Sequence, residues 1–312
     1  MDAASVSVLD GKARVDVPMR GFFPGYYPTL VRFYRLLGVE FYKRKHTVIF
    51  CRLNQATEEI KPLFSYSNVL RGVLGFGVPI PDFHGNDPLT ILRLTYDWLR
   101  FFYRAHDHVR LTKEGRGKGT GIKLGLVNPD TTIHEYLKRN NYCDAFIYDS
   151  LYAMLTGLCT CPYEDCKAYP ASVILEFYGS GVLFEGTSAV SGGVQRVCKT
   201  MSKTIPYIHL QTPVASVESF VDEKSDGQVK VRVVDSKGTE YLFDHVVIAS
   251  QGNQALAMLK NPSPEEAAAL QSFKYVKAPT YIHTDKRVMP SEGSFICGVS
   301  PASFLTFLRH HH

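Results

Sequence analysis

The chain has 312 residues, of which 45% are hydrophobic and 21% are charged, as is typical of a soluble globular protein with one large or two ordinary domains. Its net charge of +5 is modest and its basic residues are interspersed with acids, so nucleic-acid binding is not expected. Seven cysteines without regular spacing indicate reduced thiols, and no apolar window is long enough to span a bilayer. We therefore expect a cytoplasmic protein without an integral membrane segment.

The N-terminal half begins with α/β material and continues into an aromatic-rich stretch. Residues 6–17 predict two short strands around a turn at Asp10-Gly11, and residues 26–39 predict a helix that ends at Gly38. Residues 54–185 are mainly helical in pattern, and the strongest helix runs through 89–111.

A second helix of this stretch is expected to begin near residue 132. Thr131 or Thr132 is the expected N-cap of this helix, and Glu135 is the expected partner in a capping box. The stretch as a whole is interpreted as a helical cap.

The C-terminal half returns to strands. A turn at Gly192-Gly193 leads into a helix, strands follow within 207–222 and 229–250, and Asp235 to Gly238 form a hairpin turn. In particular, Phe243 to Ala249 predict a buried strand, followed by a turn and a helix from Gln254. Such strand ends are where nucleotides bind in α/β sheets.

The glycine motifs that normally hold nucleotide phosphates do not occur in this sequence. The glycine-rich stretches at 115–121 and 72–77 match neither G-x-G-x-x-G nor the P-loop pattern. The sequence therefore predicts a nucleotide-type fold that lacks the usual phosphate loop.

Four segments resemble amine-oxidase-like FAD/NAD(P)-binding flavoproteins, in particular the predicted NAD/FAD-binding oxidoreductase subgroup. They are residues 13–39, 188–203, 211–218 and 243–290, and the last contains "QAL", "PSPEE" and "HTD" in order. Such relatives also carry a glycine-rich FAD loop upstream of the position of Val6 and an FAD-binding segment beyond Pro290. The resemblance thus implies an incomplete, truncated family member.

The resemblance implies an α/β fold: a partial Rossmann-like FAD-binding domain of the amine-oxidase type with an interleaved, mainly helical substrate-binding region. The expected boundaries are 1–53 and 186–262 for the two parts of the FAD-binding domain, 54–185 for the helical substrate region, and 263–312 for a substrate-domain strand segment with an unrelated end.

The resemblance also implies FAD as the cofactor and a set of contacts to it. These contacts are Arg20, Gly21, Gly192, Gly193, Val214, Ala249 and Ser250. Glycine and small residues permit close approach of a ligand, and an arginine offsets negative charge. Each also has a structural interpretation, as a tight turn, a core strand residue or a surface ion pair. Because the pyrophosphate loop is missing, tight FAD binding by this chain alone is not expected.

Other groupings are interpreted as structural. Cys159, Cys161 and Cys166 lack the spacing of a zinc site and are expected to be buried thiols, and His106 and His108 point to different helix faces. Two acid–base pairs, His134-Glu135 and His283-Asp285, are possible, but no nucleophile elbow accompanies them. Two aromatic groups are expected in the core, with a substrate cavity as the alternative: Phe22, Phe23, Tyr26, Tyr27, and Trp98, Phe101, Phe102, Tyr103.

Three functions remain open at the level of sequence. The first is an FAD-dependent oxidoreductase that acts on an apolar small molecule, with catalytic residues unassigned. The second is a non-redox isomerase or cyclase on the same scaffold. The third is a truncated protein without catalysis.

Overall fold

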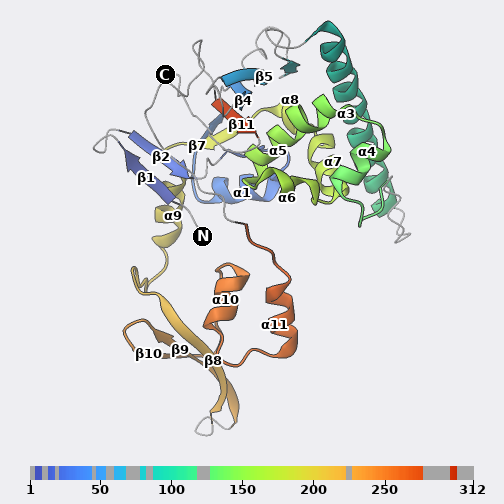
Figure 1. The fold of residues 1–312 in the computed structure, drawn as a ribbon. Helices are drawn as coiled ribbons and strands as arrows, with labels where there is room; N and C mark the ends of the chain where they lie inside the picture. Colours follow the sequence, from blue (N-terminus) through green and yellow to red (C-terminus); the bar gives the residue numbers. More distant parts are fainter. Residues whose placement is uncertain are drawn as a thin grey trace. The chain divides into compact units, whose positions relative to one another are not determined.

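A computed structural model describes residues 4–8, 13–17, 21–43, 47–53, 60–67, 78–81, 87–117, 127–222, 227–276 and 296–300. The chain forms two compact units (Figure 1). The larger unit contains Ala4–Val197 and the C-terminal strand, and the smaller unit contains Cys198–Val276. Each unit is described separately below.

The larger unit begins with a hairpin and a short helix, as the sequence predicts. Strands β1 (Ala4–Val8) and β2 (Ala13–Val17) pair antiparallel, and α1 (Pro28–Leu36) follows. Gly38 adopts a φ of +63° directly after α1, a conformation that glycine reaches without the steric cost of a side chain. Strand β3 (Phe41–Lys43) then pairs antiparallel with β7 (Ser188–Val190), far along the chain.

A four-stranded sheet occupies part of the region that the sequence predicts to be helical. Its order is β11-β4-β5-β6, and all neighbours are antiparallel except the parallel pair β11 and β4. The strands are β4 (Thr47–Leu53), β5 (Ile60–Ser67), β6 (Val78–Pro81) and β11 (Ile296–Ser300). A short aromatic run is compatible with either a helix or a strand. Here it forms strands because neighbouring strands are present to pair with it.

Between residues 88 and 185 the described part of the larger unit is helical, in agreement with the sequence pattern. The helices are α3 (Pro88–Gly117), α4 (Ile133–Arg139), η1 (Ala145–Leu151, a π-helix), α5 (Tyr152–Cys159), α6 (Tyr163–Lys167), α7 (Ala171–Gly179) and α8 (Val182–Glu185). Thr132 caps α4 in a capping box with Glu135, as predicted.

Helix α3 packs along α7, and their contact is close (Figure 1). A Cβ atom added to Gly179 on α7 would lie 2.1 Å from the carbonyl oxygen of Ala105 on α3. The backbones approach this closely because neither residue has a large side chain. Around this contact lies the core, whose largest fully buried side chains include Phe101, Leu137, Phe146, Tyr152 and Tyr178.

The smaller unit consists of a three-stranded antiparallel sheet and two helices. The sheet order is β10-β9-β8, with β8 (Val214–Asp222), β9 (Gln228–Asp235) and β10 (Glu240–Phe243). Helices α10 (Gly252–Met258) and α11 (Pro264–Gln271) follow. The predicted hairpin turn is present, since the N–H of Gly238 donates to the carbonyl of Asp235 at 3.1 Å.

The strand predicted at Phe243 to Ala249 is wrong beyond its first residue. Strand β10 ends at Phe243, residues 244–250 belong to no strand, and Val247 is 90% exposed. The local sequence favours an extended buried segment, but a strand also needs a neighbouring ladder. Within the ranges that the structure describes, no strand pairs with this segment.

Candidate functional site

One of the predicted cofactor contacts, Gly21, lies where β7 begins. Phe22 and Ser188 exchange backbone hydrogen bonds of 2.9 and 2.7 Å, which fixes Gly21 beside Thr187. A Cβ on Gly21 would lie 2.5 Å from Cγ2 of Thr187, so the glycine permits close approach of these two segments. Arg20, the neighbouring predicted contact, lies outside the described residues.

The predicted glycine pair lies where β7 ends. Gly192 and Gly193 have φ values of +80° and +77°, and they turn the chain into helix α9 (Val194–Ser202). Oδ2 of Asp16 accepts a hydrogen bond from the N–H of Val194 at 3.1 Å. The Asp16 carboxylate thus caps α9, where a negative charge is favoured by the helix dipole.

This arrangement gives the glycines a structural role and limits what else can bind at the start of α9. A Cβ on Gly193 would lie 3.1 Å from Oδ1 of Asp16, so the turn is filled by the aspartate. A ligand phosphate could bind the Val194 N–H only by displacing Asp16. The sequence does not signal this contact, because 178 residues separate the two partners.

The remaining predicted contacts belong to the smaller unit. Val214 is the first residue of β8, pairs with Asp235 and is 38% exposed. Ala249 and Ser250 are exposed and directly precede Gln251, the N-cap of α10.

The same unit supplies little for the phosphates of FAD. The N–H of Gly252, the first residue of α10, already donates to the Tyr275 hydroxyl at 2.6 Å. The first N–H groups of α9 and α10 therefore both have an acceptor within the chain, so neither helix start fits the FAD pyrophosphate as it stands.

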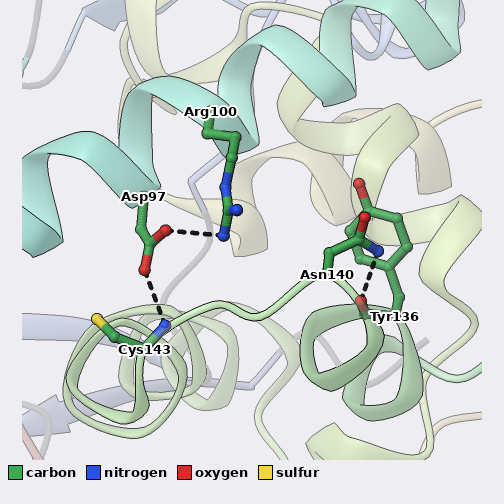
Figure 2. Close-up of polar contacts among 5 residues, drawn as sticks. All are labelled: Asp97, Arg100, Tyr136, Asn140 and Cys143. Carbon is green, nitrogen blue, oxygen red and sulfur yellow. Dashed lines mark hydrogen bonds and ion pairs between the residues drawn. The ribbon is translucent and has the colours of Figure 1, made fainter.

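A buried polar cluster in the helical region was not anticipated from the sequence (Figure 2). The Asp97 carboxylate on α3 is 4% exposed, and it accepts hydrogen bonds from Nη2 of Arg100 and from the N–H of Cys143, both at 2.8 Å. The Arg100 guanidinium lies 3.9 Å from the Tyr142 ring centroid. Burial raises the pKa of the Cys143 thiol, and the nearby Asp97 raises it further, which keeps this thiol protonated at neutral pH.

The aromatic side chains proposed as cavity or core divide between core and surface. Phe22, Phe23, Trp98 and Phe101 are buried, whereas Tyr27 and Tyr103 are 43% and 71% exposed. The Trp98 indole N–H donates to Oγ of Ser150 at 3.0 Å, which satisfies its polar group within the core.

The histidine groupings do not form the acid–base pair considered above. Glu135 is occupied by the α4 capping box, and Nδ1 of His134 lies 3.0 Å from the hydroxyl of Tyr152. His106 is exposed and His108 is buried, which confirms that they lie on different faces of α3. His283 and Asp285 lie outside the described residues.

Cys159, Cys161 and Cys166 form a group of free thiols. Sγ atoms of Cys161 and Cys166 lie 3.5 Å apart, and both side chains are buried. Hydrogen bonding to Cys161 and burial raise the pKa of Cys159. Cys159 lowers the pKa of Cys161, but Cys166 and burial outweigh this effect and raise that pKa to about 11. The raised pKa values keep the Cys159 and Cys161 thiols protonated, so these two are poor nucleophiles at neutral pH.

Comparison with solved structures defines the fold class. Wild-type putrescine oxidase bound to putrescine matches with a TM-score of 0.54 and 14% sequence identity, over 86% of this chain and 54% of that chain. A triple mutant from a redesign of cofactor binding in the same enzyme matches with a TM-score of 0.55 and 13% identity, over the same shares. The architecture is therefore that of an FAD-dependent amine oxidase, and this chain spans about half the length of those enzymes.

The family follows from the sequence itself. The model of the flavin-containing amine oxidoreductases matches residues 122–301, which is more than half of the chain. The chain belongs to this family. No curated protein matches the chain. Among the described helices, none is both long and apolar enough to cross a membrane.

Proposed function

We propose that the chain is part of an FAD-dependent oxidoreductase of the amine-oxidase type. This enzyme acts on an apolar small molecule in the cytoplasm. The observation that carries this proposal is the family match over residues 122–301, because one continuous match spans the helical region and the strands of the smaller unit. The FAD contacts proposed from the sequence are Arg20, Gly21, Gly192, Gly193, Val214, Ala249 and Ser250.

The chemistry of such a reaction belongs to the flavin, which when bound accepts a hydride from a C–N or C–C bond. The residues of this chain contribute binding and exclusion of water. Exposed small side chains at Ala249 and Ser250 allow a dinucleotide to approach the backbone. The richness of the helical region in aromatic residues is the basis for proposing an apolar substrate.

The affinity of this chain alone for FAD is expected to be weak. The pyrophosphate carries two negative charges, which are usually compensated at a helix N-terminus. At α9 the Asp16 carboxylate occupies that position, so a phosphate there would meet a like charge. We therefore propose that a further phosphate site is needed for tight binding.

The first experiment is flavin titration of the purified 312-residue chain. FAD fluorescence and visible absorbance report uptake, and released flavin is quantified after denaturation. Ala249→Asp places a carboxylate at the proposed dinucleotide contact and should weaken FAD uptake by about tenfold or more, because like charges repel. Ala268→Asp, at an exposed position on α11, is the matched control and should leave uptake unchanged.

Three results would contradict the proposal. The first is a folded chain that takes up no FAD at high micromolar concentration, and the second is an equal loss of FAD uptake in Ala249→Asp and Ala268→Asp. The third is a flavin-loaded sample that turns over no substrate. Turnover is measured as oxygen consumption with apolar arylalkylamines, and putrescine is the polar comparison substrate. Preference for the apolar amines supports the substrate class, whereas preference for putrescine contradicts it.

A further inference from the structure

Helix α3 carries a row of apolar side chains on the face opposite the core. Its buried face includes Leu94, Trp98, Phe101 and Ala105, which are at most 3% exposed. The opposite face has five large side chains that are between 56% and 71% exposed and are spaced alternately three and four residues apart. This exposed stripe consists of Leu89, Leu92, Tyr96, Leu99 and Tyr103.

The spacing places all five side chains of the exposed stripe on one side of a straight helix. Burying three leucines and two tyrosines removes a large apolar area from water, so a helix face of this kind indicates an interaction surface. The stripe extends along much of α3, which lies at the margin of the helical region (Figure 1).

Arginines line one edge of the exposed stripe. Arg93 and Arg104 are exposed, and the Arg100 guanidinium carbon lies 5.4 Å from the Tyr96 ring centroid. Within the described ranges, no carboxylate forms a salt bridge with Arg93 or Arg104. Two acids of α3 are paired with other arginines: Asp97 with Arg100 and Asp107 with Arg110.

We propose that the exposed stripe lies on an anionic lipid bilayer surface, parallel to the membrane plane. The leucine and tyrosine side chains enter the boundary between headgroups and acyl chains, and Arg93 and Arg104 contact lipid phosphates. A basic edge beside a row of leucines and tyrosines is complementary to such a surface. The proposed association is peripheral, with α3 lying along the surface; none of the described helices is long and apolar enough to cross the bilayer.

A second copy of the chain fits this face less well. In an antiparallel pair of α3 helices, the arginine edge of one copy faces the arginine edge of the other, and like charges repel. In a parallel pair, the arginines face the opposite edge, where Thr95 and Phe102 provide no carboxylate. An anionic surface compensates the arginines, and a second α3 does not.

Vesicle co-sedimentation of the 312-residue chain tests the proposal without reference to flavin binding. The wild-type chain should bind vesicles of phosphatidylcholine and phosphatidylglycerol, and binding should fall with added salt and on vesicles of phosphatidylcholine alone. Leu92→Glu with Leu99→Glu should lower the partition coefficient by about tenfold or more, since both side chains leave the interface. Arg93→Gln and Arg104→Gln should each lower it by about fivefold.

Matched control variants distinguish vesicle binding through the exposed stripe from nonspecific vesicle binding by the rest of the surface. Leu36→Glu with Leu210→Glu makes the same change of charge at side chains that are 83% and 80% exposed, and vesicle binding should be retained. Arg35→Gln and Arg139→Gln remove exposed arginines elsewhere and should have less than a twofold effect. Circular dichroism confirms that the variants are folded.

Three outcomes would overturn the proposal. One is a folded wild-type chain that does not bind the anionic vesicles. Another is equal loss of binding in the stripe variants and their controls. The last is a dimer in solution that Leu92→Glu with Leu99→Glu converts to a monomer, since the stripe would then be an interface between copies.

Discussion

Asp97 on α3 accepts a hydrogen bond of 2.8 Å from the backbone N–H of Cys143, which lies 46 residues further along the chain. The same carboxylate pairs with Arg100, so one buried acid joins α3 to the segment that leads into η1 (Figure 2). Asp97→Ala should lower the free energy of unfolding by about 2 to 3 kcal/mol, because a buried N–H and a largely buried guanidinium lose their acceptor. Urea denaturation monitored by circular dichroism measures the change.

The control for this prediction lies on the same helix. Asp107 pairs with Arg110 near the surface, so Asp107→Asn should change the free energy of unfolding by less than about 0.5 kcal/mol. Equal losses for the two aspartate variants would show that the Asp97 contacts add no specific stability.

Because α3 and α7 pack so closely, one added methyl group at their contact should strongly lower the stability of the chain. Gly179→Ala should destabilise the chain by about 2 kcal/mol or more, because the new Cβ would overlap the Ala105 carbonyl and the helices would have to separate. Gly157→Ala on α5 is the control: nothing lies within 4 Å of its added Cβ, and its stability should stay the same or rise by up to about 1 kcal/mol. A thermal shift of the same size in both variants would contradict the model of helix contact.

The cap of α9 predicts a graded effect at Asp16. Asp16→Ala removes the acceptor for the Val194 N–H and should cost about 1 kcal/mol, whereas Asp16→Asn retains an oxygen acceptor and should cost less. Asp130→Ala, at an exposed position, serves as the control and should be nearly neutral. Stability of Asp16→Ala equal to that of the wild type in chemical denaturation would rule out this capping role.

The buried side chain of His108 is expected to lower the free energy of unfolding in acid. Burial lowers its pKa, and Glu176 partly offsets that effect. As pH falls below about 6.5, the unfolded imidazole takes up a proton before the folded one, so the free energy of unfolding falls, by at most about 1.4 kcal/mol per pH unit. The contribution is fully present above the unfolded pKa and is lost toward the lower folded pKa.

Denaturation at pH 7.5, 6.0 and 5.0 tests this sign. His108→Gln should flatten the dependence of unfolding free energy on pH over this window, whereas His106→Gln, which changes an exposed side chain, should keep the wild-type slope. A slope that His108→Gln leaves unchanged would assign the acid sensitivity to other groups.

The elements that are stabilised by contacts between residues close in sequence could be predicted. The capping box of Thr132 and Glu135, the turn from Asp235 to Gly238 and the long helix α3 depend on residues three or four positions apart, so the local pattern contains the necessary information. The family resemblance was also carried by sequence blocks and is confirmed by the family match.

The tertiary structure decided the features that depend on distant partners. Whether Phe243 to Ala249 forms a strand depends on a neighbouring ladder, and the local apolar pattern contains no information about that neighbour. The Asp16 cap of Val194 joins residues 178 positions apart, and the close contact of Gly179 with Ala105 arises from helix packing. Amino-acid sequence alone therefore determined the local elements and the family. Packing between remote segments decided which polar groups are buried, which glycines are indispensable and which face of α3 remains exposed, because these depend on surfaces that exist only after the chain has folded.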